Sequence, residues 1–408
     1  MKCRHCHAEL ATTFLDLGSA PPSNAYLSAA QLRAPETWYP LRLLVCESCW
    51  LVQTEDHAGR EALFTEDYAY FSSFSSSWLE HSRRYVETMR ERFALDRRSL
   101  VAEVAANDGY LLQYVQQAGI PCYGIEPTAS TAAAARAKGL VIVERFFGIA
   151  LAEELAAQGR QVDLVAANNV LAHVPDINDF AAGFARLLKP QGVATFEFPH
   201  LMRMIALNQF DTAYHEHYSY LSLGAVQRIF AAAGLQVFDV EELPTHGGSL
   251  RVFAQRADAG TQPTSAAVAA LVQREAAAGL GRVEHYRGFQ GRAERVKDDL
   301  LRFLLEAKAA GRRVAAYGAA AKGNTLLNFA GVRADLLAFV VDRNPAKQGR
   351  YMPGSRIPIV GEPQLREQRP QDILLLPWNL KAELVEQLAY AREWGARFVT
   401  AVPTLELA

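Results

Sequence analysis

A short stretch near the middle of the chain concentrates side chains that can do chemistry. The sequence AYHEHYSY, residues 213–220, contains two histidines, one glutamate and three tyrosines. Such a segment fits a metal site, a polar loop with packed tyrosines and solvated histidines, or an acid/base site. No third metal ligand stands at a recognisable spacing, which weakens the first interpretation. A histidine titrates near neutral pH and a neighbouring carboxylate can orient it, so general acid/base catalysis is favoured.

Four of the five cysteines form two pairs with the same spacing, Cys3 with Cys6 and Cys46 with Cys49, and Cys122 stands alone. A two-residue gap lets a tight turn direct both thiolates at one ion, and two such turns complete the tetrahedral set that zinc prefers. A redox-active pair is the alternative, and the repeated spacing favours a structural zinc site. Four thiolates leave no open coordination position, so the expected role of the ion is folding.

The segment between the two cysteine pairs is longer than is usual for such zinc modules. Part of it, TFLDLGSAPPSNAYLS, predicts a loop or hairpin on the small module. His5 and His7, which lie beside the first pair, are spare potential ligands.

Length, charge and hydropathy limit the classes of function. A chain of 408 residues is expected to form about two or three domains. The formal net charge is -2 and no run of lysine and arginine is present, so no nucleic-acid partner is expected. The first residues, MKCRHCHAEL, lack an apolar signal region, and no apolar stretch approaches the ~18 residues of a membrane span. We therefore expect a cytoplasmic protein without a membrane partner.

The elements that must position these side chains follow a helical segment, SSSWLEHSRRYVETMRERFAL. The apolar run Leu100 to Val104 ends in AANDG and passes into an amphipathic helix, which is the strand, turn and helix of a Rossmann-type first unit. IPCYGIEP predicts a second strand that ends in Glu126, where a carboxylate can accept both hydroxyls of a ribose. DLVAANNVLAHVPD and LLKPQGVATFEFPH predict a third and a fourth strand.

This order of elements resembles the class I methyltransferases that use S-adenosylmethionine. The first strand carries an acidic residue, no G-x-G-x-x-G is present, and KPQG precedes a late strand. Ala105 and Ala106 stand where such enzymes commonly have glycine, so either the ligand approaches this turn slightly differently or Asn107 and Asp108 make the contact. The alternative is a degenerate Rossmann domain that binds nothing. The expected cofactor-binding residues are Glu103, Ala106, Asn107, Asp108, Gly109, Glu126, Asn168 and Asn169.

Motifs along nearly the whole chain, taken in order, resemble the three-domain sugar C-methyltransferases. They are CRHC, CESC, EVAANDGYLL, NNVLAHVPD, FDTAYHEHYSYLSL, HGGSLRVF and GAAAKGNTLLN. The resemblance implies methylation at C3 of a nucleotide-linked 4-keto-deoxysugar, with His217 as the catalytic base. It further implies that the reacting sugar is surrounded by Tyr214, Glu216, His173 and one of Tyr68 or Tyr70.

The side chains agree with this chemistry, because a methyl acceptor that is carbon requires a base. A ketone at C4 acidifies the hydrogen on C3, His217 can remove it, and His173 or a tyrosine hydroxyl can donate to the enolate oxygen. No metal is required for that step. On an extended segment Glu216 would point away from His217, and His215 would lie about 7 Å along the chain from it.

The C-terminal third repeats the strand, turn and helix pattern. Ala-rich sequence from about residue 265 to 311 predicts long connecting helices, and RRVAAYGAAAKGNTLLNFAG then opens a second Rossmann-like fold. Its GAAAKG turn can offer backbone N–H groups and Lys322 to a diphosphate at a helix N-terminus, unless this domain is only structural. An interdomain ion pair is the alternative for Arg251. The expected substrate-binding residues are His246, Ser249, Arg251, Lys322, Asn324 and Trp378.

Together these features predict an α/β protein of three parts. A small N-terminal four-cysteine zinc module covers residues 1–60, and a class I SAM-methyltransferase Rossmann-like middle domain with the active-site insertion covers 61–264. A helical connector and a second Rossmann-like C-terminal domain cover 265–408. The expected ligands are S-adenosylmethionine, a structural zinc ion and a nucleotide-linked keto-sugar. The alternatives are an O- or N-methyltransferase of a nucleotide sugar and a non-catalytic zinc and Rossmann binding module.

Overall fold

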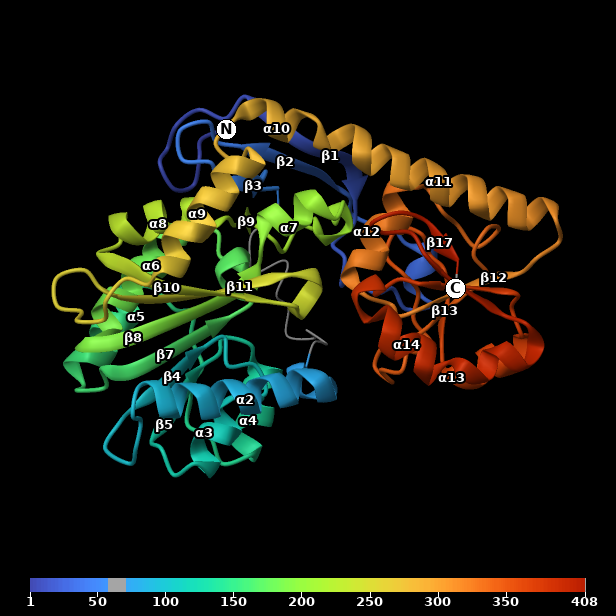
Figure 1. The fold of residues 1–408 in the computed structure, drawn as a ribbon. Helices are drawn as coiled ribbons and strands as arrows, with labels where there is room; N and C mark the ends of the chain where they lie inside the picture. Colours follow the sequence, from blue (N-terminus) through green and yellow to red (C-terminus); the bar gives the residue numbers. More distant parts are fainter. Residues whose placement is uncertain (58–70, 408) are drawn as a thin grey trace.

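The strands gather into three β-sheets that follow one another along the chain (Figure 1). The structure, a computed structural model, describes residues 1–57 and 71–407. Tyr68 and Tyr70 lie outside the described residues. Within those ranges the sheets have four, seven and six strands. The predicted α/β class, with a four-cysteine module followed by two Rossmann-like sheets, is confirmed.

The N-terminal sheet is a small antiparallel sheet that takes its last strand from the middle of the chain. Buried and exposed residues nearly alternate along its first strand, so one face packs inward. The strand order is β1-β2-β3-β9, and β9 begins directly after the AYHEHY residues and pairs Tyr220 with Val52. Its strands are β1 (Thr12–Ala20), β2 (Tyr39–Val45), β3 (Val52–Thr54) and β9 (Ser219–Tyr220).

The connection between β1 and β2 leaves the N-terminal module. The two strands pair antiparallel, as a hairpin would, but Leu27 in the connection forms a β-bridge with Tyr351 of the C-terminal body. Tyr26, beside it, donates its hydroxyl to the carbonyl of Ala319 at 2.6 Å. The predicted hairpin is therefore present in the pairing of β1 with β2, and the loop that joins the two strands has its partners in a distant part of the sequence.

The middle sheet is mostly parallel, and β11 runs antiparallel between β8 and β10. The order is β10-β11-β8-β7-β4-β5-β6. Crossover helices between parallel strands bring the ends of β4, β5 and β7 to one edge, where ligands bind in such sheets. The strands are β4 (Val101–Val104), β5 (Cys122–Ile125), β6 (Ile142–Val143), β7 (Val162–Asn168), β8 (Leu188–Pro199), β10 (Leu235–Leu243) and β11 (Ser249–Arg256).

Apolar clusters bury both faces of the middle sheet under helices. One cluster joins the sheet to α2, α3 and α4, and the other joins it to α5, α6 and α8. The second cluster also contains three of the paired cysteines, so the cysteine module packs on that face. The helices are α2 (Ser76–Arg92), α3 (Leu112–Gln117), α4 (Ala129–Ala137), α5 (Ile149–Ala157), α6 (Ile177–Leu187), α7 (Leu201–Ala206) and α8 (Leu223–Ala232).

A helical connector leads into the C-terminal body, as predicted. The longest helix, α11, runs from the N-terminal sheet to the C-terminal sheet (Figure 1). At its start Phe289 stacks on Phe14 of β1 with ring centroids 4.7 Å apart, and its later apolar residues join the core of the C-terminal body. The connector contains α9 (Ala266–Ala278), α10 (Val283–Arg287) and α11 (Phe289–Ala309).

The C-terminal sheet has the order β14-β13-β12-β15-β16-β17, and all of its pairs are parallel except that of β16 with β17. Its strands are β12 (Val314–Tyr317), β13 (Val340–Val341), β14 (Ile359–Val360), β15 (Asp372–Leu375), β16 (Arg397–Thr400) and β17 (Glu406–Leu407). Its α-helices are α12 (Ala321–Phe329), α13 (Glu362–Gln368) and α14 (Lys381–Gln387).

Short 3-10 helices complete the fold and place several loops. They are η1 (Gln31–Arg33), η2 (Ser72–Phe74), η3 (Leu171–His173), η4 (Phe210–Thr212), η5 (Thr245–Gly247), η6 (Trp378–Leu380) and η7 (Ala389–Trp394). None of the helices in the described ranges combines the length and the apolar surface that crossing a bilayer requires. The predicted domain boundaries near residues 60 and 264 stay a prediction.

Candidate active site

One large cavity lies where the N-terminal module, the domain of the middle sheet and the domain of the C-terminal sheet meet. These three parts are called bodies below. Its volume is about 490 Å³, which lies in the usual range for a small-molecule site. The wall is formed by the turns after β4, β5 and β7, by residues 212–217, by the N-terminal loop and by the start of α12. Its polar lining residues include Asn24, Asn107, Glu126, Asn168, Asn169, His173, Tyr214, Glu216, His217, His246, Lys322, Lys347 and Asn379.

Left-handed backbone conformations shape the turn after β4. Ala105 has φ 60° and Asn107 has φ 49°, which glycine adopts more easily than either. The N–H of Asn107 donates to Glu126 Oε2 at 2.9 Å, and the N–H of Thr128 donates to Oε1 at 2.9 Å. These bonds tie the first turn to the end of β5 and hold the Glu126 carboxylate at the cavity wall. Burial raises the pKa of Glu126, and the two backbone donors oppose that rise.

The predicted cofactor residues divide between the cavity wall and the layer beneath it. Glu103 is fully buried in β4, where burial raises the pKa of its carboxyl group well above the usual range. Gly109 has φ 78°, and a Cβ there would meet the Leu140 side chain, so the turn requires glycine at this position. Glu103, Ala106, Asp108 and Gly109 lie beneath the wall, and Asn107, Glu126, Asn168 and Asn169 lie on it. We expect direct ligand contacts from the second group.

The AYHEHYSY segment contains a tight turn, so the relative positions that an extended segment would give to His215, Glu216 and His217 do not apply. The N–H of His217 donates to the carbonyl of Tyr214 at 2.9 Å and closes the turn. His215 consequently faces the N-terminal sheet, with Nε2 3.3 Å from the carbonyl oxygen of Tyr39. Glu216 and His217 both line the cavity, so Glu216 does not point away from the site.

One ring nitrogen of His217 is held, and the other is left as an acceptor. Nδ1 lies 3.0 Å from the carbonyl oxygen of Thr212. Because a carbonyl oxygen only accepts, Nδ1 carries the hydrogen and Nε2 carries the lone pair. Burial is the main cause that lowers the pKa of His217 well below its usual value, so the ring is neutral near neutral pH. A neutral and oriented imidazole is the form that a general base needs.

Titratable groups surround His217 in the cavity. The ring of His173 lies edge-on to it with centroids 4.5 Å apart, and the ring of Tyr214 lies at 3.9 Å. Burial lowers the pKa of His173 to about 4, and a hydrogen bond to the backbone of Glu216 partly offsets this shift. Burial raises the pKa of Glu216 to about 7, and a hydrogen bond from Asn24 opposes the rise. Two neutral histidines therefore stand beside a carboxyl group that titrates near neutral pH.

Both ends of this turn are fixed by other bodies of the protein. Thr325 of α12 donates its hydroxyl to the carbonyl of Ala213 at 2.8 Å. Thr54 of β3 donates its hydroxyl to the carbonyl of His217 at 3.1 Å. The position of the His217 ring therefore depends on the N-terminal sheet and on the C-terminal body together.

Lys322 brings a positive charge to the opposite wall, near the start of α12. Its Nζ donates to Asn379 Oδ1 at 2.7 Å and lies over the ring of Trp378. Burial lowers the pKa of Lys322, and Asp211 opposes that shift. Trp378, whose Nε1 donates to Asp211 Oδ2 at 2.7 Å, and the fully buried Asn324 lie behind the wall. Neither side chain is among the lining residues of the cavity, and their contact with substrate stays a prediction.

Of the three residues predicted in the HGGSLR loop, His246 alone lies on the cavity wall. Burial lowers its pKa to about 4. Ser249 donates its hydroxyl to a backbone carbonyl of the preceding turn at 3.0 Å. Arg251 forms ion pairs with Glu197 at 3.2 Å and Glu241 at 3.0 Å, within the middle sheet. Ser249 and Arg251 are not among the lining residues of the cavity, because β11 directs both side chains to partners in its own domain, and their contact with substrate stays a prediction.

Several polar residues of the wall, among them Asn379, were not expected from the sequence, and two of these are Asn24 and Lys347. Both lie in loops with proline a few residues before them, APPSN and DRNPAK. A polar side chain in such a rigid turn is a signal that could have pointed to them, because binding residues are common on well-positioned loops.

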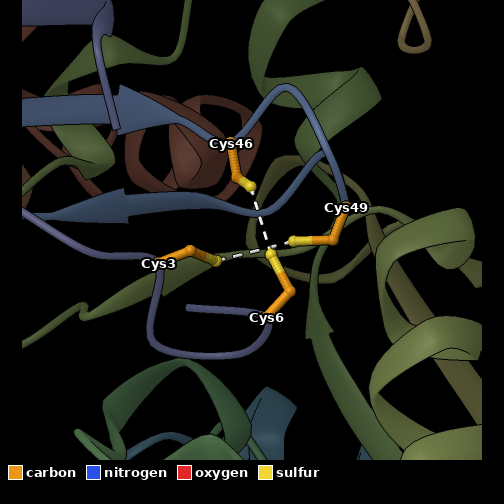
Figure 2. A group of neighbouring side chains, drawn as sticks. All are labelled: Cys3, Cys6, Cys46 and Cys49. Atoms are coloured by element: carbon orange, nitrogen blue, oxygen red, sulfur yellow. Dashed lines mark hydrogen bonds between the residues drawn. The ribbon is translucent and has the colours of Figure 1, made fainter. Parts of the chain in front are cut away.

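The four paired cysteines converge on one point (Figure 2). Their sulfur atoms lie within 4.8 Å of one another. Four sulfurs around a zinc ion at about 2.3 Å would lie about 3.8 Å apart, so this set fits the ion in a closed tetrahedral site. His5 and His7 are outside the group, and His5 instead has Nδ1 2.8 Å from Asn178 Oδ1.

Known protein families match this chain in three successive parts. A model described as "Putative zinc binding domain" matches residues 3–64, and one described as "Methyltransferase domain" matches 78–240. A third, described as "C-methyltransferase C-terminal domain", matches 244–403. The C-methyltransferase NovU of Streptomyces niveus is 34% identical over 402 residues, which cover 98% of this chain and 95% of that protein.

Solved methyltransferase structures resemble part of the chain more distantly. Magnesium protoporphyrin IX methyltransferase (ChlM) from Synechocystis PCC 6803 with bound SAH is 16% identical and covers 44% of this chain and 83% of its own, with a TM-score of 0.35. A S-adenosylmethionine-dependent methyltransferase from Clostridium acetobutylicum ATCC 824 is 9% identical. The match covers 45% of this chain and 92% of that protein, with a TM-score of 0.35. These likenesses extend over less than half of this chain.

Replacement of a zinc ligand should destabilise the protein more than it slows the surviving enzyme. In Cys46→Ser we expect loss of the zinc ion, lower soluble yield and a Tm lower by about 5–10 °C, because structural metal binding contributes folding free energy. Metal analysis and thermal unfolding measure this. The matched control is Cys122→Ser, which removes the cysteine outside the four-sulfur group and should keep about one zinc per chain. Freshly purified wild-type protein without zinc would contradict the assignment.

Loss of the Glu126 carboxylate should weaken the binding of S-adenosylmethionine. We expect Glu126→Ala to cost about 1.5–3 kcal/mol, or roughly 10- to 150-fold in Kd, because charge-assisted hydrogen bonds to the ribose are removed. Calorimetric titration measures the Kd. Glu144→Ala, which removes an exposed carboxylate paired with Arg136, should leave it unchanged. An unaltered Kd in Glu126→Ala would place the ribose elsewhere.

Proposed function

This chain belongs to the C-methyltransferase family with an N-terminal zinc-binding domain, and we propose that it methylates C3 of a nucleotide-linked 4-keto-deoxysugar with His217 as the base. It is an S-adenosylmethionine-dependent enzyme. The observation that carries the proposal is the geometry of His217. Its Nδ1–H donates to the Thr212 carbonyl, and the ring lines the cavity. Nε2 therefore carries the lone pair that can accept a proton at the site.

A base of this kind is needed when the methyl acceptor is a carbon atom, and it is not needed when the acceptor is a good nucleophile. An amine or a hydroxyl can attack a methyl donor through its own lone pair, whereas a carbon atom must first lose a proton. A ketone at C4 makes the hydrogen on C3 acidic, because the electron pair that remains spreads onto the carbonyl oxygen. His217 takes that proton at Nε2, and His173 or Tyr214 donates a hydrogen bond to the developing oxyanion.

The proposed cofactor supplies the other reactant. When bound, S-adenosylmethionine would supply an electrophilic methyl group on its sulfonium. The electron pair at C3 would form the new bond to that carbon as the methyl–sulfur bond breaks, and S-adenosylhomocysteine would leave. Glu126, with Asn107, Asn168 and Asn169 on the same wall, fits the hydroxyls and polar atoms of its nucleoside. His217 is left protonated and returns the proton to solvent.

The wall opposite these residues fits the nucleotide part of the sugar substrate. Lys322 lines the cavity at the first turn of α12, a helix of nine residues. Backbone N–H groups at a helix N-terminus and a lysine together suit a diphosphate. Substrate held between this wall and the turn of His217 would present its sugar ring to Nε2.

The identity of the methylated atom is the test of the proposed function. The protein is incubated with S-adenosylmethionine labelled with 13C in the methyl group and with dTDP-, GDP- and CDP-linked 4-keto-deoxysugars. NMR correlation of the new methyl group to C3 through one C–C bond supports the proposal. Correlation through oxygen or nitrogen would make the protein an O- or N-methyltransferase, and binding without product would favour the non-catalytic module.

His217→Asn should separate chemistry from binding. Asparagine can still donate to the Thr212 carbonyl but cannot accept the C3 proton, so we expect turnover to fall roughly 10²- to 10⁴-fold. The dissociation constants of both substrates should stay unchanged in calorimetry.

The neighbouring histidine provides the matched control for this variant. His215 faces the carbonyls of Tyr39 and Pro40, outside the cavity wall, so His215→Asn should keep turnover within a few-fold of wild type. Loss of turnover in His215→Asn with normal turnover in His217→Asn would reverse the assignment. Near-normal turnover in both variants would move the base to another residue, first His173.

A further inference from the structure

A side chain from the N-terminal loop reaches the cavity and holds the carboxylate of Glu216. Asn24 Nδ2 donates to both carboxylate oxygens, at 3.0 Å to Oε1 and 2.9 Å to Oε2, across 192 positions of sequence. Both residues line the cavity. One amide nitrogen shared between two oxygens fixes the plane of the carboxylate, and each oxygen keeps further lone pairs for a ligand.

The loop that carries Asn24 is held on both sides. The strand β1 ends shortly before it, and Tyr26 follows it with its hydroxyl bonded to the Ala319 carbonyl at 2.6 Å. The next residue, Leu27, forms the β-bridge to Tyr351. Asn24 therefore meets Glu216 from a loop that is fixed between the N-terminal sheet and the C-terminal body, and its amide does not have to be ordered when the substrate binds.

Groups from each element packed against Glu216 could influence its ionisation. They are Asn24 and Tyr26 of the N-terminal loop, His173 of η3, Tyr214 and His217 of its own turn, and Lys347 of the C-terminal body. Burial has the largest effect on Glu216 and raises its pKa to about 7. The hydrogen bond from Asn24 acts in the opposite direction and lowers this pKa. Removal of the amide therefore takes away an interaction that favours the ionised form.

We infer that Asn24 is a positioning residue whose amide fixes the Glu216 carboxylate as a hydrogen-bond acceptor facing the reacting sugar. This inference rests on the proposed function for the identity of that sugar. The zinc module thus contributes a residue to the active site as well as stability. A carboxylate in this place accepts a hydrogen bond from a sugar hydroxyl and orients C3 toward His217, which a protonated carboxyl group does less well.

The first arm of the test needs no sugar substrate. The carboxyl carbons of glutamate are labelled with 13C, and the Glu216 signal is identified by its loss in Glu216→Gln. Its titration midpoint in the wild type should lie near pH 7. In Asn24→Ala the midpoint should rise by about one pH unit, and in the isosteric Asn24→Asp it should rise further because a like charge replaces the donor. An unchanged midpoint in both variants overturns the inference.

The second arm asks whether the effect is more than structural. With a midpoint about one unit higher, kcat/KM for the sugar in Asn24→Ala should be roughly fivefold lower at pH 7 and recover near pH 9, while the Kd of S-adenosylmethionine stays constant. A loss of rate that is equal at all pH values overturns the positioning role. Ala25→Ser, an exposed change at the neighbouring position of the same loop, should alter neither arm.

The two arms also separate this inference from the proposed function. A raised midpoint without methyl transfer to any 4-keto sugar supports the role of Asn24 at Glu216 and counts against the proposed substrate. Methyl transfer at C3 with an unchanged titration midpoint of Glu216 supports the proposed substrate and counts against the role of Asn24. Zinc content and Tm are measured for each variant, and Asn24→Asp, which keeps the shape of the side chain, serves where Asn24→Ala is poorly folded.

Discussion

The turn that carries Glu216 and His217 is fixed by bodies other than its own, and the geometry of the site depends on that constraint. The hydroxyls of Thr325 and Thr54 hold its two ends, and β9 then pairs with β3 of the N-terminal sheet. From β3, Gln53 Nε2 donates to Cys3 Sγ at 3.3 Å. A structural zinc ion at the four cysteines would therefore stabilise the strand next to the turn that carries the proposed base.

Burial sets the protonation of the cavity and makes it suitable for a carbon nucleophile. It lowers the pKa values of His173, His217 and His246 and raises that of Glu216. Neutral histidines do not repel a sulfonium donor. The same desolvation weakens His217 as a base in the empty cavity, so the acidity that a C4 ketone gives to C3 is an essential part of the proposed mechanism.

Features that depend on short spacings could be predicted from the sequence, and those that depend on distant pairing could not. The cysteine pairs, the strand, turn and helix units and the position of Glu126 follow from local patterns. The turn at His217 could not be predicted, because the contacts that fix its two ends come from Thr325 and Thr54, which are distant in sequence. The role of Asn24 was missed for the same reason, and Arg251 was placed in the cleft because its partners Glu197 and Glu241 lie on other strands.

The most direct test of the central claim, that His217 removes the proton from C3, is solvent exchange at that carbon. The 4-keto sugar is incubated in D2O with S-adenosylhomocysteine in place of the methyl donor, and deuterium at C3 is followed by NMR. The wild-type enzyme should exchange this hydrogen, His215→Asn should exchange it at a similar rate, and His217→Asn should not. Exchange in His217→Asn as fast as in the wild type would contradict the claim.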